Sequence, residues 1–507
     1  MNSIKEDKIP GWLYGLVLLI ICFISRLPQL LSPNLLMDGD ECILGLMAKH
    51  IADGKEIPVF FSGQNYGFSL IENIFGAIGF KLFGIGAVTL RVSLLVIWSI
   101  GILFFFQTFL LLTTKRNAFH ITLVMVLIPA WALGAMKARG GYITAFTLTS
   151  IVIYLIIKLK DKPGYILSII LGLITGIIYL SRPFWLPGLV PVYVYLYIYK
   201  KNYKQLLVIV PCMIITVVVT NKLFIAPTNE YWKPALFTDF NYFRMLKEIP
   251  SRIYYNLTGA YWLDHNIKLG IFTRVSTLIW SNLIIVGTVL QIYRIIKKKY
   301  LPWSHVFFAS MIFTLAYIPL LNQNYGARYL LPYSGFLVMW LGVEIIDFMK
   351  RRNNLKKYLY GFIFVLFIFG SGSIIEYWNF NFMPPITENN KSEKERIDEL
   401  LGYLQKNKVN NIFSANPMFQ WEIMFYSKEE IIARWYNDTD RNPIYPKIVD
   451  KAFNENKPTA IVGYKNEMLG LDKNPSTKDQ IVYLGDRYFA YLNPSKDLLK
   501  SMGYSFQ

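Results

Sequence analysis

The sequence predicts an α-helical polytopic membrane protein with about 11 transmembrane helices and a small C-terminal α/β domain. Hydrophobic residues occupy 54% of the 507 positions, which is more than a soluble domain of this size carries. Lys and Arg stand in short clusters between the apolar runs, as they do in cytoplasmic loops. Beyond about residue 377 the chain becomes polar and alternates short helical and strand patterns.

The positive charge of the chain follows the same membrane pattern. Basic residues exceed acidic ones by 52 to 33. In a soluble protein this excess would suggest nucleic acid, but here the basic clusters alternate with apolar runs, so we expect a membrane and no nucleic acid as partner. The three cysteines, Cys22, Cys42 and Cys212, show no metal-ligand spacing, so neither a disulfide framework nor a zinc site is expected.

The basic clusters also constrain the number of spans. If all clusters are cytoplasmic, an even number of spans must separate neighbouring clusters. The run 69–83 breaks this parity, but it is short, carries Glu72 and Lys81 and ends at Gly84, so it predicts an interfacial helix on the outer face. The predicted spans are 12–31, 87–112, 118–136, 143–158, 164–180, 184–199, 205–225, 270–293, 302–321, 329–348 and 358–375.

An odd number of spans places the two ends of the chain on opposite sides. With the N-terminus in the cytoplasm, the transmembrane domain 1–377 is followed by an extracytoplasmic domain, 378–507. Loop 32–86 is the longest outer loop between helices. In the tail, 396–406 predicts a helix with Arg396 on its polar side. Strands are predicted within 410–414, 459–463 and 481–492.

Loop 32–86 opens with three carboxylates in four residues, Asp38, Asp40 and Glu41. Such a cluster is costly beside a membrane unless a cation, a proton or a reaction uses it. Apolar residues then recur at helical spacing, so Asp40 and Glu41 should begin an amphipathic helix whose dipole keeps a carboxylate ionised, as a general base requires. The alternative is that Asp38 or Asp40 only caps that helix.

Three arginines stand at separate outer turns. Arg139 precedes Gly140-Gly141-Tyr142, Arg182 precedes a proline, and Arg328 opens a helix beside Tyr329. Each could extend to lipid headgroups without further function. Together, beside an acidic loop, they predict a phosphate site, because the guanidinium fork suits phosphate oxygens.

The irregular stretch 60–67 combines amides with aromatic rings. Amide groups can hydrogen-bond sugar hydroxyls, and an aromatic face can cover a sugar ring. We therefore treat Gln64, Asn65 and Tyr66, with Tyr142 and Tyr329 from the arginine turns, as candidate substrate-binding residues.

The order of several motifs resembles the GT-C class of membrane glycosyltransferases. They are Asp40-Glu41 after the first helix, Gly-Gln-x-Tyr-Gly at 63–67, the interfacial helix ending in Leu82-Phe83-Gly84, Leu90-Arg91 at the second span, and Arg328-Tyr329-Leu330-Leu331-Pro332. The branch most similar is the protein mannosyltransferase and aminoarabinose transferase superfamily. The resemblance covers roughly residues 12 to 350.

This resemblance implies the GT-C fold and a sugar donor carried on polyprenyl or dolichyl phosphate. It implies that Asp40 is the catalytic base with Glu41 as its neighbour, whereas Asp38 has no counterpart. Two departures stand out. Phe68 occupies the place of a lysine near the donor phosphate in the aminoarabinose branch, and Arg139-Gly140-Gly141 replaces an acidic residue. Phosphate binding is therefore expected to rest on arginine, and the substrate to differ from aminoarabinose.

The predicted function is an inverting transfer of a hexose or pentose from the lipid phosphate to a hydroxyl of a lipid, glycan or protein. No cofactor is expected to be required, although the carboxylates of Asp38, Asp40 and Glu41 could hold a divalent metal. One alternative is a transporter or flippase of lipid-linked sugars, which would usually show internal repeats and ionisable residues in mid-span. A non-catalytic scaffold would leave the acidic loop unexplained.

Overall fold

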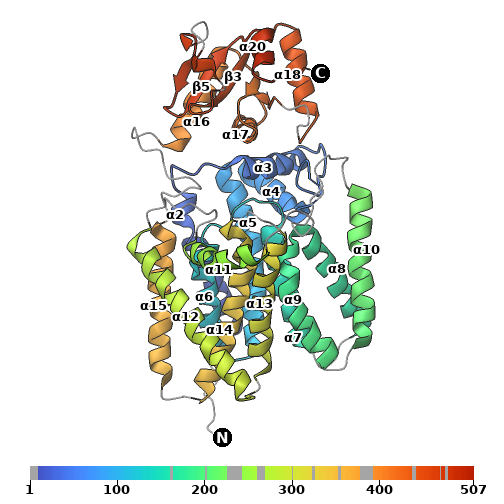
Figure 1. The fold of residues 1–507 in the computed structure, drawn as a ribbon, viewed down its shortest axis with the longest axis vertical. Helices are drawn as coiled ribbons and strands as arrows, with labels where there is room; N and C mark the ends of the chain where they lie inside the picture. Colours follow the sequence, from blue (N-terminus) through green and yellow to red (C-terminus); the bar gives the residue numbers. More distant parts are fainter. Residues whose placement is uncertain are drawn as a thin grey trace.

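The structure is a computed structural model with two parts, a bundle of α-helices and a C-terminal α/β domain at one end of it (Figure 1). The described residues are 9–64, 66–159, 164–199, 203–224, 242–259, 269–299, 301–321, 326–351, 355–376, 392–436, 441–468, 470–473 and 478–506. The predicted domain boundary at 377/378 lies outside these residues.

Apolar segments form the bundle, because a helix satisfies its own backbone hydrogen bonds in lipid. The helices are α1 (Gly11–Ile24), α5 (Ala87–Leu110), α6 (Lys115–Leu127), α7 (Tyr142–Leu159), α8 (Tyr165–Ser181), α9 (Leu186–Tyr193), α10 (Leu206–Phe224), α12 (Ile271–Ile296), α13 (Pro302–Leu321), α14 (Leu331–Arg351) and α15 (Lys356–Glu376). Each predicted span overlaps one of them, although α6 ends at Leu127 and covers only the first part of the predicted span 118–136. Among the described residues, seven helices are long and apolar enough to cross a membrane, and α7, α8 and Pro183–Ile198 are apolar but shorter.

The outer helices of the bundle expose apolar side chains. On α10, for example, Ile214, Ile215, Val218 and Val219 are exposed. The inner helices α5 and α14 instead bury large rings, including Trp98 and Trp340. Apolar side chains both inside and outside a helix bundle are the pattern of a protein whose solvent is lipid, so the chain is an integral membrane protein.

Two helices of the predicted outer loop lie between the bundle and the C-terminal domain (Figure 1). The helix α4 (Leu70–Phe83) occupies the predicted interfacial segment and is not among the helices apolar enough to cross. The helix α3 (Gly39–Ala52) was expected to be amphipathic, yet it is buried on nearly all sides. The reason is tertiary: α4 packs against it from the bundle, and α17 (Phe419–Tyr426) packs against it from the C-terminal domain.

The C-terminal domain is a five-stranded mixed sheet in the order β2-β1-β3-β5-β4. The strands are β1 (Asn411–Ser414), β2 (Ile432–Arg434), β3 (Thr459–Tyr464), β4 (Val482–Leu484) and β5 (Tyr488–Leu492). The central β3 is parallel to β1, with Asn411 opposite Thr459, and antiparallel to β5, with Ala460 opposite Leu492. The accompanying helices are α16 (Glu393–Lys406), α17, α18 (Ile444–Asn454) and α20 (Lys496–Ser501).

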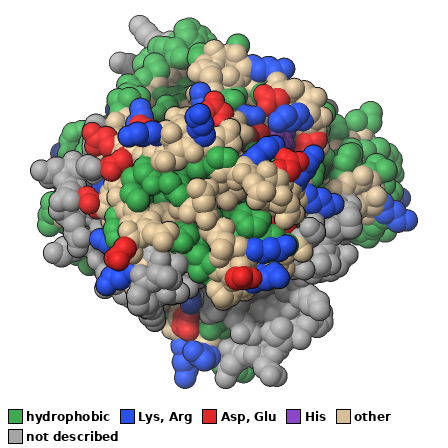
Figure 2. Space-filling model, turned by 90° about the horizontal axis from the view of Figure 1, so that it is seen from above, with side chains coloured by type: hydrophobic (Ala, Val, Ile, Leu, Met, Phe, Trp, Pro, Cys, Tyr) green, Lys and Arg blue, Asp and Glu red, His purple; other side chains and the backbone are tan. Residues whose placement is uncertain are grey.

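The predicted strands and the predicted helix of this domain are present, with one correction. Arg396 was expected on the polar side of its helix, but it is buried and forms an ion pair with Glu393 at 2.7 Å. A charged residue can take a core position when a partner compensates its burial. Seen from above, basic and acidic side chains are interspersed over the domain, as on a surface that faces water (Figure 2).

The C-terminal domain docks on α3 through close packing. A Cβ atom at Gly45 would lie 2.4 Å from the Phe425 ring, and one at Gly39 would lie 2.7 Å from the Met418 carbonyl oxygen. These distances are shorter than any ordinary contact, so only glycine allows α17 to approach this closely. The Tyr426 hydroxyl oxygen also accepts the Met37 backbone N–H at 2.8 Å. The domain is therefore fixed on the outer loop that carries the carboxylates.

Candidate functional site

A cavity of about 980 Å³ lies between the end of the bundle and the C-terminal domain. It gathers most of the predicted site residues: Asp38, Asp40, Gln64, Tyr66, Arg139, Tyr142, Arg182, Arg328 and Tyr329. Asn65 lies outside the described residues. The C-terminal domain supplies the opposite wall, which the sequence did not predict.

Asp38 is the residue that caps α3. Its Oδ1 accepts the Glu41 backbone N–H at 3.2 Å, and Glu41 Oε2 in turn accepts the Asp38 N–H at 3.4 Å, which completes a capping box. The other oxygen of Asp38 accepts hydrogen bonds from Lys137 Nζ at 2.8 Å and Arg139 Nη2 at 2.6 Å. Burial alone would raise the pKa of Asp38, but the charges of Arg139 and Lys137 outweigh it and lower that pKa. The capping alternative thus holds for Asp38 and leaves Asp40 available.

Glu41 is fully buried and does not line the cavity. Arg91, near the start of α5, binds both of its oxygens, with Nε–Oε1 at 3.2 Å and Nη2–Oε2 at 2.9 Å. Lys137 Nζ adds a third contact at 2.8 Å. Burial would raise the pKa of Glu41, but Arg91 and Lys137 lower it. Glu41 therefore links the start of α3 to α5 through Arg91 and to the segment before α7 through Lys137, behind the residues that line the cavity.

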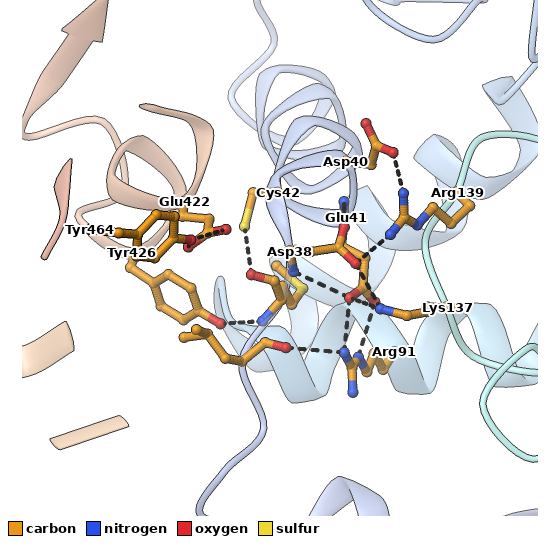
Figure 3. A network of polar contacts seen from close by, with 12 residues as sticks. Asp38, Asp40, Glu41, Cys42, Arg91, Lys137, Arg139, Glu422, Tyr426 and Tyr464 are labelled. Atoms are coloured by element: carbon orange, nitrogen blue, oxygen red, sulfur yellow. Dashed lines mark hydrogen bonds and ion pairs between the residues drawn. The ribbon is translucent and has the colours of Figure 1, made fainter. Parts of the chain in front are cut away.

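Asp40 lies in the first turn of α3 with its carboxylate at the cavity, and its side chain is 19% exposed. Arg139 Nη1 donates to one oxygen, Oδ2 (Figure 3). The other oxygen, Oδ1, lies 3.9 Å from Nη1 of Arg441, a residue of the C-terminal domain. Asp40 thus meets the cavity with Oδ2 bound by Arg139 and Oδ1 near Arg441, and a carboxylate fixed in this way at a cavity is a candidate general base.

The turn that carries Arg139 is built around two glycines and a buried acid. Gly140 and Gly141 have φ angles of 58° and 90°, which favour glycine. The carboxylate of Glu72 on α4 accepts the Gly141 N–H at 2.9 Å and the Thr144 N–H at 3.1 Å, at the start of α7. Glu72, noted in the sequence only as a reason against a span, thus anchors the segment that presents Arg139 to the cavity.

The structure brings the three predicted arginines to one cavity. Arg182 donates to the Arg139 carbonyl oxygen and lies over the Tyr142 ring, 4.1 Å from its centroid. Arg328 lies over Tyr329 at 5.1 Å, and the Tyr142 and Tyr329 rings are 6.4 Å apart. Aromatic faces hold a guanidinium without neutralising its charge. A shared cavity explains these positions better than separate contacts with lipid headgroups.

Phe68, which stands where the aminoarabinose branch has a lysine, does not reach the cavity. Its ring is buried and packs edge-on against Phe60, with centroids 6.3 Å apart. A lysine near the carboxylates comes instead from position 137, two residues before Arg139. Sequence reasoning missed Lys137 and Arg91 as site residues, although both are cations beside predicted outer turns.

The three predicted carboxylates, Asp38, Asp40 and Glu41, have cationic partners. Within the described part of the chain, no group of three or more His, Cys, Asp or Glu side chains is arranged to hold a metal ion. Lys137, Arg139 and Arg91 occupy the positions around Asp38, Asp40 and Glu41 where a divalent ion would bind. These residues do not fit a metal, and we assign it no step.

The fold and the site define a polytopic membrane protein whose outer loop and C-terminal domain enclose a cavity of carboxylates and arginines. No protein-family model matches the chain, and no curated protein sequence matches it. Among solved structures, it is similar to ArnT from Cupriavidus metallidurans in the apo state, with a TM-score of 0.60 and 12% identity over 98% of this chain and 99% of that chain.

The same ArnT bound to undecaprenyl phosphate gives a TM-score of 0.58 and 13% identity over 96% of this chain and 98% of that chain. The Archaeoglobus fulgidus oligosaccharyltransferase gives 0.48 and 14% identity over 93% of this chain and 71% of that chain. The chain therefore has the GT-C fold that the sequence resemblance implies, and the match with ArnT includes the C-terminal domain.

Proposed function

We propose that this protein is a membrane glycosyltransferase that moves a hexose or pentose from a polyprenyl or dolichyl phosphate to an acceptor hydroxyl on the extracytoplasmic face. One observation carries the proposal: Asp40 and the three arginines 139, 182 and 328 line the same cavity at one end of the bundle. A base and several phosphate-binding cations side by side are what displacement from a lipid phosphate requires. The undecaprenyl phosphate bound to the structurally similar ArnT supports a donor of this class.

The reaction is a single displacement at the anomeric carbon of the donor sugar. The acceptor oxygen forms a bond to this carbon while the bond from the carbon to the phosphate oxygen breaks, so the configuration inverts. The acceptor proton passes to Asp40 Oδ1, and the bond electrons leave with the polyprenyl phosphate. Arg182 and Arg328 stabilise the charge that builds on this phosphate. Asp40 then releases its proton to water.

Arg139 has two parts in this proposal. Through Nη1 it fixes Oδ2 of Asp40, which leaves Oδ1 for the acceptor hydroxyl. It also adds to the positive field that attracts the phosphate. Gln64, Tyr66, Tyr142 and Tyr329 are assigned to the sugar, because they line the same cavity as the carboxylates and the arginines.

The test is purified full-length protein in lipid nanodiscs with a panel of polyprenyl phosphate sugars. We expect Asp40→Asn to lower the transfer rate by about 10²- to 10⁴-fold, the usual contribution of a general base, while undecaprenyl phosphate still binds. Glu430→Gln, at an exposed position of the C-terminal domain, is the matched control and should leave transfer unchanged. Full transfer by Asp40→Asn would remove Asp40 as the base. If no donor is consumed and lipid-linked sugar crosses the membrane of proteoliposomes, the protein is a transporter.

A further inference from the structure

The wall of the cavity that belongs to the C-terminal domain is almost entirely polar. Most of its residues come from three places that the sheet brings together: the start of α17, the end of β3 and the turn between β4 and β5. Among them are Asn416, Glu422, Tyr464, Glu467 and Arg487. Glu393 at the start of α16 and Arg441 before α18 also line it. Of the described residues that this domain contributes to the cavity, Met418 alone has an apolar side chain. A wall of this kind offers hydrogen bonds to a ligand and little apolar surface.

Glu422 stands out on this wall. It is only 4% exposed, yet it lines the cavity. The Tyr464 hydroxyl donates to its Oε2 at 2.8 Å and Oε1 at 3.0 Å, and no ion pair to Glu422 is present within the described ranges. A carboxyl group has about four positions for hydrogen bonds, so one hydroxyl leaves most of them open.

The other buried carboxylates of this region are compensated. Glu41 binds Arg91 and Lys137, Glu393 binds Arg396 and Arg487, and Asp450 binds Arg434. Glu422 lacks such a cation, and its burial raises its pKa to about 8, although the bond from Tyr464 and the charge of Arg487 act in the opposite direction. A buried carboxyl group with open hydrogen-bonding positions at a cavity is suited to the hydroxyl groups of a ligand.

Glu422 lies apart from Arg139 of the bundle. In Figure 3, Glu422 and Tyr464 lie on one side of Asp38, and Arg139 with Asp40 lies on the other. The donor phosphate belongs with the arginines of the bundle, so a ligand at Glu422 is on the acceptor side of Asp40. The cavity volume of about 980 Å³ leaves room for a second sugar beside the donor sugar, because pockets for drug-sized molecules begin at about 300 Å³.

We propose that Glu422 and Tyr464 form an acceptor subsite and that the acceptor is a glycan, held by its hydroxyl groups against the C-terminal domain. This inference rests on the proposed transferase function and names its acceptor. A glycan brings several hydroxyls within a few ångströms, which matches a wall of carboxyl, amide and guanidinium groups. A lipid alcohol brings one hydroxyl and an apolar chain, and it would leave the polar groups of this wall unpaired.

The experiment compares wild type, Glu422→Gln and Tyr464→Phe as full-length proteins in nanodiscs. The acceptor probes are p-nitrophenyl glycosides of mono- and disaccharides, a serine-containing peptide and farnesol. Donor hydrolysis by water, measured without acceptor, reports the donor site alone. We expect Glu422→Gln to raise the KM for the glycoside that is used by about tenfold or more, while donor KM and donor hydrolysis stay unchanged.

Matched controls are Glu430→Gln and Tyr483→Phe, which change the same groups at exposed positions of the same domain. An equal loss of donor hydrolysis and transfer in Glu422→Gln would place this residue in the donor site and overturn the proposal. An unchanged glycoside KM, or transfer to the peptide or to farnesol instead of every glycoside, would also overturn it.

Direct binding separates this proposal from the proposed function. Saturation-transfer NMR of the glycosides with the nanodiscs needs no turnover. Glycoside binding that wild type shows and Glu422→Gln loses supports the subsite even if no donor is ever consumed, in which case the transferase proposal fails alone. Binding that both proteins show equally, or that neither shows, contradicts the subsite even if transfer occurs.

Discussion

At the scale of single residues, the two neighbouring acids Asp40 and Glu41 have different surroundings. Asp40 meets the cavity and has one oxygen held by Arg139, whereas Glu41 is sealed from it between Arg91 and Lys137. The same motif thus supplies a reactive position and an anchor one residue apart, because successive positions of a helix point in directions about 100° apart. Glu41 fits a positioning role, in which it fixes the start of α3 relative to α5.

This difference predicts distinct effects of substitution. Glu41→Gln keeps the shape of the side chain but leaves the buried charge of Arg91 without its carboxylate partner, while Lys137 keeps Asp38. Breaking a buried ion pair in this way costs about 3–5 kcal/mol, so we expect a clearly lower midpoint of thermal unfolding in detergent. Glu430→Gln, at the surface, should change stability by less than about 0.5 kcal/mol. If Glu41→Gln unfolds like wild type but loses transfer, Glu41 acts in the chemistry instead.

At the scale of elements, α3 connects the helical bundle to the C-terminal domain. It touches the bundle through α4 and the C-terminal domain through α17, and its first turn carries the carboxylates. The closeness of α17 depends on Gly45, where any side chain would meet the Phe425 ring. The position of the cavity walls relative to each other therefore depends on a glycine that takes no part in the chemistry.

We expect Gly45→Ala to loosen the docking of the C-terminal domain while both parts stay folded. The added methyl group must displace the Phe425 ring, and overpacking of this kind typically costs about 1–3 kcal/mol. Hydrogen exchange should rise in α17 and in the first turn of α3, and not in the sheet. Gly402→Ala is the control, because a Cβ there meets nothing within 4 Å and alanine favours the helix α16. Equal exchange in both variants would show that the close approach at Gly45 has no part in docking.

The elements also show what the sequence can predict and why. The spans follow from hydropathy and the basic clusters, which are local properties, and each has a helix in the structure. The pairing of Asp40 with Arg139 joins residues 99 positions apart, and no periodicity records such a contact. No motif or periodicity in the sequence marks Glu422 or Arg441 as site residues, because they reach the cavity only after the sheet has formed and α17 has docked. The strand β2, with three residues, is too short to show an alternation.

At the scale of the whole molecule, the site lies where two solvents meet. The C-terminal domain lies at one end of the bundle (Figure 1). The bundle faces lipid, the C-terminal domain faces water, and residues of both line the cavity. This arrangement suits a reaction between a substrate with a lipid tail and a polar acceptor. The lipid phosphate can stay at the membrane boundary beside the arginines, while the acceptor approaches from the side of the C-terminal domain. The proposed reaction therefore takes place on the face of the membrane that holds the C-terminal domain, which the basic clusters predict to be extracytoplasmic.

This orientation can be tested with single cysteines in whole cells or spheroplasts. Lys394→Cys lies at an exposed position of α16 in the C-terminal domain, and Lys299→Cys lies in the basic cluster after α12. A membrane-impermeant maleimide should label Lys394→Cys directly and Lys299→Cys only after permeabilisation, because the positive cluster is held in the cytoplasm. Background labelling should be low, since Cys22 and Cys42 are buried and Cys212 lies within the membrane helix α10. The reverse pattern would place the cavity in the cytoplasm, where the donor and acceptor would have to be sought on the other face.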